Sequence, residues 1–159
     1  MLPAAAGTRR GVMMNLSHLY TSFEGRIGRQ SWWIGIVGLL VIGIVGVLVI
    51  DGLLDLGSTA GLVVFLLFEL ALVYPAYCLM GKRFQDRNRP AIYGLIGIVV
   101  LLAIAHLDFF GIAHDATGWP TPIGWVGSLI QLIVGIWFLV ELGFLRGTVG
   151  PNRYGADPV

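Results

Sequence analysis

Four long stretches of this chain are almost free of charge, and they constrain its fold more than any other feature. Each is long enough to cross about 30 Å of hydrocarbon as an α-helix that rises about 1.5 Å per residue. None alternates apolar with polar residues, as the strands of a membrane barrel do. We therefore expect an all-α integral membrane protein, a four-helix bundle with spans at residues 32–50, 60–80, 91–110 and 123–145.

Composition excludes the other broad fold classes. Hydrophobic residues make up 57% of the chain and charged residues 12%, against roughly 25% charged residues in an average soluble domain. A soluble domain needs more polar surface than this, and a disordered chain needs low hydrophobicity and high charge. The single cysteine, Cys78, excludes a disulfide framework.

The distribution of basic residues predicts the orientation of the spans. All 10 Lys and Arg residues lie in the N-terminal segment, in the link between the second and third spans, or in the C-terminal tail. The other two links, residues 51–59 and 108–122, carry aspartates and no Lys or Arg. Because basic residues in short loops stay in the cytoplasm, we expect both termini on the cytoplasmic side.

The N-terminal region has no apolar core of a secretory signal. We interpret residues 1–12 as a loose tail, or as residues that precede the true start at Met13 or Met14, before a single membrane domain over residues 13–159. Leu16, Leu19, Tyr20 and Phe23 then follow helical i, i+3, i+4, i+7 spacing. One apolar stripe of this kind is typical of a short amphipathic helix on the membrane surface. A helix folded onto the cytoplasmic end of the bundle would show the same pattern.

Three short motifs flank the spans. The first is FEGRIGR at residues 23–29, followed by two tryptophans; the second is KRFQD at residues 82–86; the third is GPNRYGADP at residues 150–158. In this order they resemble the signatures of a family of bacterial inner-membrane proteins, domain of unknown function 805, the YhaH/YhaI-like proteins. The resemblance covers residues 16–158. It implies a multi-pass protein of the bacterial cytoplasmic (inner) membrane and brings no known activity with it.

The second motif departs from the family pattern at two places. Gln85 stands where the family usually has a histidine, and Pro90-Ala91 stands where it usually has Ser-Gly. No role of that histidine in proton or metal chemistry is therefore carried over to this chain.

All three motifs fall on the cytoplasmic side of the topology that the charges predict. Because the inner ends of neighbouring helices in a bundle lie about 10 Å apart, we expect the motifs to form one polar cap. Its candidate members are Arg26, Arg29, Lys82, Arg83, Asp86, Arg89, Arg153 and Asp157.

The cap has two interpretations. It is either a set of internal salt bridges or a site for an anion such as a lipid headgroup or phosphate. Asp86 is the lone acid in a basic link, and we predict that it accepts hydrogen bonds from Arg26, Arg29 or Arg153.

Glu69 lies close to the middle of the second span, where a carboxylate costs about 2.5 to 3.5 kcal/mol on insertion scales. Gln131 lies at a similar depth in the fourth span. We therefore predict a polar pair, Glu69–Gln131, that locks two helices together. Two alternatives stay open: a small proton- or ion-coupled transporter or channel subunit that uses Glu69, and a contact of Glu69 with a partner subunit.

The outer side carries a small group of potential ligands, His106, Asp108, His114 and Asp115, but their spacing matches no metal signature. The sequence also lacks a nucleophile elbow, a phosphate loop and a dinucleotide fingerprint. We expect no enzyme and no catalytic, cofactor or metal site.

The function that these patterns favour is that of a structural, scaffold or regulatory membrane protein. Its expected partners are the lipid bilayer, including anionic headgroups, and further copies or other subunits in an oligomer; nucleic acid is not among them.

Overall fold

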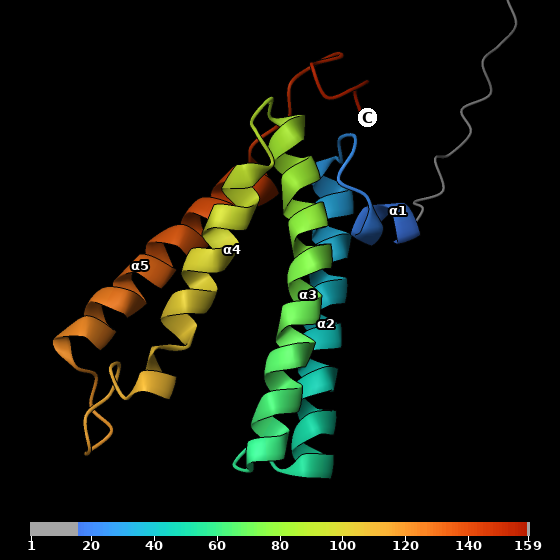
Figure 1. Ribbon diagram of the computed structural model, residues 1–159. Helices are drawn as coiled ribbons and strands as arrows, with labels where there is room; N and C mark the ends of the chain where they lie inside the picture. The colour runs from blue at the N-terminus through green and yellow to red at the C-terminus, as the bar shows by residue number, and fades with distance from the viewer. Residues whose placement is uncertain (1–15, 159) are drawn as a thin grey trace, which may run out of the picture.

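The computed structural model describes residues 16–158, and this part of the chain is helical without a β-strand. Figure 1 shows the elements, which are α1 (Leu16–Thr21), α2 (Arg29–Leu54), α3 (Thr59–Asp86), α4 (Ile92–Ala105), η1 (Leu107–Phe110), α5 (Pro122–Phe138) and η2 (Leu139–Phe144). The all-α prediction is confirmed. The predicted tail at residues 1–12 lies outside the described residues.

Helices α2 and α3 pack against each other as an antiparallel hairpin (Figure 1). The hydroxyl of Ser58 accepts a hydrogen bond of 3.0 Å from the Gly61 amide and so caps the start of α3. Along the hairpin, glycines of α2 lie directly against α3 side chains, Gly35 against Leu79 and Gly46 against Phe68. Such small residues let membrane helices approach closely.

Three helices are long and apolar enough to cross a membrane: α2, α3 and the continuous helix Pro122–Phe144 formed by α5 and η2. Only 17% of the most apolar stretch of α2 is buried inside the protein. A helix that is apolar on all sides and largely unburied is suited to a lipid environment. These helices support the assignment of the chain as a membrane protein.

The expected span at residues 91–110 is not one continuous helix, which corrects the sequence prediction. The helix α4 ends at Ala105, and the 3₁₀ turn η1 follows His106. Nδ1 of His106 donates to the Leu102 carbonyl at 2.8 Å, and Gly111 ends the turn with a left-handed φ of 63°. Because the apolar run continues to Phe110, hydropathy alone does not reveal this helix end.

Helices α4 and α5 form a second hairpin. The two hairpins meet at the end of the molecule where α1 and the C-terminal segment (residues 145–158) lie, and they diverge towards the other end (Figure 1). We call these the cap end and the far end. Core residues such as Leu79, Phe84, Phe138 and Leu142 are buried together at the cap end. A four-helix bundle packed along its whole length is therefore not confirmed.

The short helix α1 is folded onto the α2–α3 hairpin. Leu19 is buried, and the Tyr20 hydroxyl donates to the Gly35 carbonyl of α2 at 3.0 Å. The second helix of the hairpin also holds α1, because the Tyr74 hydroxyl of α3 donates to the Thr21 carbonyl at 2.9 Å. Of the two interpretations of this segment, the structure agrees with the helix that packs on the helical hairpin.

Candidate functional site

The centre of the cap is the carboxylate of Asp86, at the end of α3, held between two arginines. Arg26 donates to Oδ1 through Nε at 3.0 Å and through Nη2 at 2.9 Å. Arg83, one turn earlier in α3, donates to Oδ2. All three side chains are buried, with 1%, 0% and 4% of the Arg26, Arg83 and Asp86 side chains exposed. The predicted contact between Asp86 and an arginine of another motif is therefore present, and the partner is Arg26.

The remaining donors of the two arginines are directed at backbone carbonyls of the C-terminal segment. Arg26 donates to Thr148 at 2.6 Å and to Gly150 at 2.7 Å. Arg83 donates to Leu142 at 2.7 Å and also to Leu145. A buried charge is costly unless it is paired and its other donors are satisfied. Each nitrogen of both guanidinium groups has an acceptor, and together the two arginines fasten η2 and the C-terminal segment to α3.

Further hydrogen bonds to the backbone at the end of α3 strengthen the attachment of the C-terminal segment. The amide of Thr148 donates to the Asp86 carbonyl at 2.9 Å, and the Asn152 side chain of the third motif donates to the Gln85 carbonyl at 2.9 Å. Gly147 lies so close to the Asp86 carboxylate that a Cβ atom would overlap it. The sequence gives no signal for this role of Gly147, because it depends on contacts distant along the chain.

Gln85 connects the second motif to the first. With its amide nitrogen turned towards the first motif, it donates to the Gly25 carbonyl at 2.7 Å and to the Phe23 carbonyl at 3.1 Å. A neutral histidine has a single N–H donor, whereas an amide has two. Gln85 thus fits two carbonyls at once, which is a structural role.

Lys82 is fully buried and faces carbonyls instead of a carboxylate. Its ammonium donates to the carbonyls of Leu19, at 2.8 Å, and of His18 in the short helix α1. The last carbonyls of a helix lack intrahelical partners, and a lysine is a suitable donor to them. Lys82 therefore attaches α1 to α3.

The π-helical turn η2 places a second buried acid in the cap. Glu141 is 5% exposed, and its carboxylate lies 2.6 Å from Nε of Arg87 and 3.3 Å from Nε of Arg89. The other candidate members lie at the rim of the cap: Arg153 donates to the Asn88 carbonyl at 3.1 Å, and Asp157 accepts from the Gly150 amide at 2.7 Å.

A polar cavity of about 160 Å³ opens beside this network, and two exposed arginines line it. Arg29 donates to the Phe144 carbonyl at 3.1 Å. The guanidinium of Arg146 makes no hydrogen bond that was identified within residues 16–158. Asp157 also lines the cavity. One turn after Arg29 in α2, the Trp33 indole donates to the Gly143 carbonyl at 3.2 Å.

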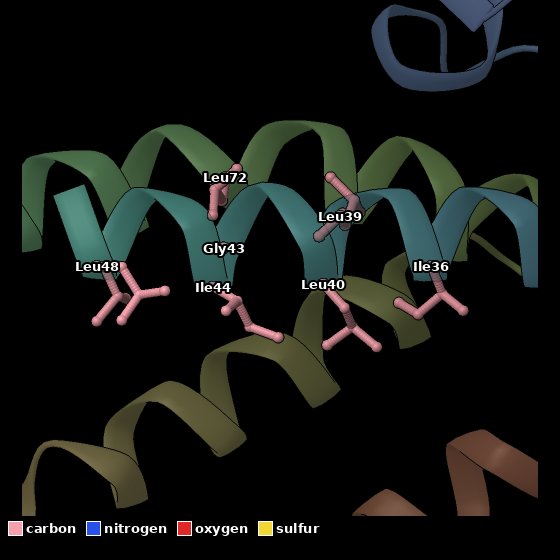
Figure 2. Close-up of a pocket in the computed structure, with 9 residues that line it drawn as sticks. Ile36, Leu39, Leu40, Gly43, Ile44, Leu48 and Leu72 are labelled. Atoms are coloured by element: carbon pink, nitrogen blue, oxygen red, sulfur yellow. The ribbon is translucent and has the colours of Figure 1, made fainter.

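An apolar groove of about 490 Å³ runs along α2 and α3, as Figure 2 shows. It is lined by Ile36, Leu39, Leu40, Gly43, Ile44, Val47, Leu48, Leu72 and Ala76. In Figure 2 the Leu40, Ile44 and Leu48 side chains extend from α2 towards the side on which α4 lies.

The predicted pair Glu69–Gln131 is not formed. Glu69 lies 2.9 Å from Nε2 of His106, at the end of α4, whereas Gln131 donates within its own hairpin to the Leu101 carbonyl at 3.4 Å. The two residues are kept apart because the hairpins diverge and α4, not α5, lies on the side of Glu69. The sequence places His106 at the outer link, and the early end of α4 brings it into the reach of Glu69.

The other residues of the predicted ligand group make local contacts. Nδ1 of His114 lies 2.7 Å from the Asp108 carboxylate, and both side chains are about half exposed. Within residues 16–158, no three His, Cys, Asp or Glu side chains are grouped as a metal site requires.

Comparison with known proteins identifies a family and two relatives. The family model described as "Protein of unknown function (DUF805)" matches residues 20–156. The uncharacterized protein YiiR of Escherichia coli K12 is 31% identical over 146 residues, which are 91% of this chain and 90% of that protein. YiiR of Escherichia coli O157:H7 matches with the same identity and coverage. No solved structure matches.

Proposed function

Because the chain belongs to the DUF805 family of proteins of unknown function, we propose a function from the geometry of its cap: a non-enzymatic scaffold protein of the bacterial inner membrane. In this proposal the chain crosses the membrane four times, α4 with η1 forms the short third span, and both termini lie in the cytoplasm. Its three motifs form one rigid cytoplasmic platform on which other components assemble.

The buried network around Asp86 carries this proposal. Arg26 of the first motif, Asp86 of the second and the backbone next to the third motif are joined by short hydrogen bonds, and the side chains of Arg26 and Asp86 are buried. A catalytic or transport site needs unsatisfied polar groups that face a substrate. Here the charged groups satisfy one another, which favours a structural role.

The orientation is supported by the positions of α1, of the C-terminal segment and of the basic residues. The helix α1 and the C-terminal segment are at the same end in Figure 1, as an even number of crossings requires. All three motifs, with their basic residues, lie at this cap end, and the positive-inside rule assigns such an end to the cytoplasm.

Cysteine labelling tests the topology. On a Cys78→Ala background, Val149→Cys at the cap end and Ala116→Cys at the far end both place a thiol at an exposed position. In intact cells opened only at the outer membrane, a membrane-impermeant maleimide should label the thiol at position 116 and reach position 149 only after lysis. Labelling of position 149 before lysis would overturn the orientation.

A second candidate function is the binding of anionic lipid headgroups, and the polar cavity favours it. Arg26 and Arg83 are occupied by internal bonds, whereas Arg29 and Arg146 are exposed at the cavity. Trp33, one turn after Arg29 in α2, is of a residue type that prefers the headgroup level. A basic residue near an anionic leaflet gains about 1 kcal/mol.

Nanodiscs of stated lipid composition test this second function. Replacing part of the phosphatidylcholine with phosphatidylglycerol should raise the melting temperature of the wild type, and Arg146→Ala should reduce that increase. Arg153→Ala is the matched control, because Arg153 is exposed at the cap but does not line the cavity. An equal increase in all three proteins would contradict a specific headgroup site.

A further inference from the structure

Glu69 and His106 form a polar contact in the part of the molecule where the two hairpins diverge. Glu69 belongs to α3 and His106 follows the last residue of α4, and Oε2 lies 2.9 Å from Nε2. Within residues 16–158, all other side-chain hydrogen bonds between the two hairpins lie in the cap. This pair is thus the polar link between the hairpins in the far half of the molecule.

Both residues lie at a depth that corresponds to the hydrocarbon core. Glu69 is ten residues after the start of α3 at Thr59, or about 15 Å along the helix axis. The 14 residues of α4 place His106 about 21 Å from the cap-end start of that helix, less than the roughly 30 Å of hydrocarbon. The His106 ring stacks on Phe109, with ring centroids 5.3 Å apart.

The hydrogen bonds of His106 fix the number of protons in this contact. Nδ1 lies 2.8 Å from the Leu102 carbonyl, and because a carbonyl only accepts, Nδ1 carries a hydrogen. Between Nε2 and the Glu69 oxygen there is then room for one more hydrogen. It is bound either to nitrogen, giving an imidazolium beside a carboxylate, or to oxygen, giving a neutral imidazole beside a carboxylic acid.

In both forms the pair is neutral overall and holds one exchangeable proton. If that proton leaves, a lone pair of Nε2 faces a carboxylate oxygen, and a net negative charge remains within the hydrocarbon. Such a charge is expensive there, and the attraction between the hairpins is lost.

We propose that Glu69 and His106 are a one-proton binding site that holds the far halves of the two hairpins together while the proton is bound and releases them when it leaves. The site is independent of the cap and of the proposed scaffold function.

Other titratable groups near the far end are accounted for. Helix α4 carries no charged residue, and α5 carries none either. Asp51 and Asp55 accept from the Leu56 and Gly57 amides, and Asp115 accepts from the amides of Thr117 and Trp119. Asp108 of η1 is paired with His114. That second pair lies within one link and does not join the hairpins, so it provides a matched control.

Distances between spin labels test the proposal in the full chain in nanodiscs. On a Cys78→Ala background, labels are attached at Leu53→Cys and Ile123→Cys, two exposed far-end positions in different hairpins. Raising the pH should lengthen the mean distance in the otherwise unmodified chain, and lowering it again should restore the short distance.

Three variants separate this mechanism from general pH effects. In Glu69→Gln an amide N–H can donate to Nε2 without a titratable proton, so the short distance should persist at all pH values. His106→Ala removes the link and should give the long distance throughout, whereas His114→Asn should behave like the parent. A pH response that survives Glu69→Gln, or the absence of any response in the parent protein, would overturn the proposal.

Discussion

At the scale of single residues, the cap depends on the carboxylate of Asp86, which leaves no space for a side chain at Gly147. Asp86 accepts from Arg26 and Arg83, and the chain returns past it at Gly147. The sequence predicts that Asp86 is important because it is the lone acid of a basic link. It does not predict Gly147, whose role comes from the path of the C-terminal segment.

The substitution Gly147→Ala should destabilise the protein. The added methyl group would overlap the Asp86 carboxylate and push it away from its two arginines. Overpacking alone costs typically 1 to about 3 kcal/mol. The melting temperature in detergent checks this, with Gly135→Ala as the control because nothing lies within 4 Å of a Cβ at that position. If both variants melted alike, the close approach at Gly147 would be without energetic consequence.

At the scale of elements, the sequence predicts the number and approximate position of the helices but not all of their ends or partners. The predicted spans at 32–50 and 60–80 lie inside α2 and α3. The early end of α4 escapes the prediction because apolar residues continue beyond it. The partner of Glu69 escapes it for the same reason, because a continuous span over residues 91–110 puts His106 near the outer link and not beside Glu69.

The attachment of α1 gives a prediction at this scale. In Lys82→Met the terminal carbonyls of α1 at His18 and Leu19 lose their donor, while the apolar volume is largely kept. Amide hydrogen exchange in α1 should become faster, and exchange in the middle of α2 should stay unchanged. Arg89→Met is the comparison, because Arg87 still pairs with Glu141 in that variant. Equal protection of α1 in the two variants would count against its attachment through Lys82.

At the scale of the whole molecule, stability is concentrated at one end. The buried core and the charged network both lie at the cap end, and the far halves of the hairpins are joined by Glu69 and His106. Charge distribution along the sequence indicates where the polar end must lie, because it depends only on residue types. The divergence of the hairpins cannot be read from hydropathy, since a lipid-facing side chain and a helix-facing side chain are equally apolar.

Arg26 and Asp86 join the first and second motifs through one buried interaction. Its most direct test is a double-mutant cycle of Arg26→Gln and Asp86→Asn, measured as unfolding free energies in detergent. Asp86→Asn leaves two buried guanidinium groups without a carboxylate, and Arg26→Gln leaves Asp86 with Arg83 alone. Each change should therefore cost on the order of 3 kcal/mol, more than Asp157→Asn. The double variant should lose clearly less than the sum of the two single losses. Strictly additive losses, or an Asp86→Asn protein as stable as the wild type, would contradict the account.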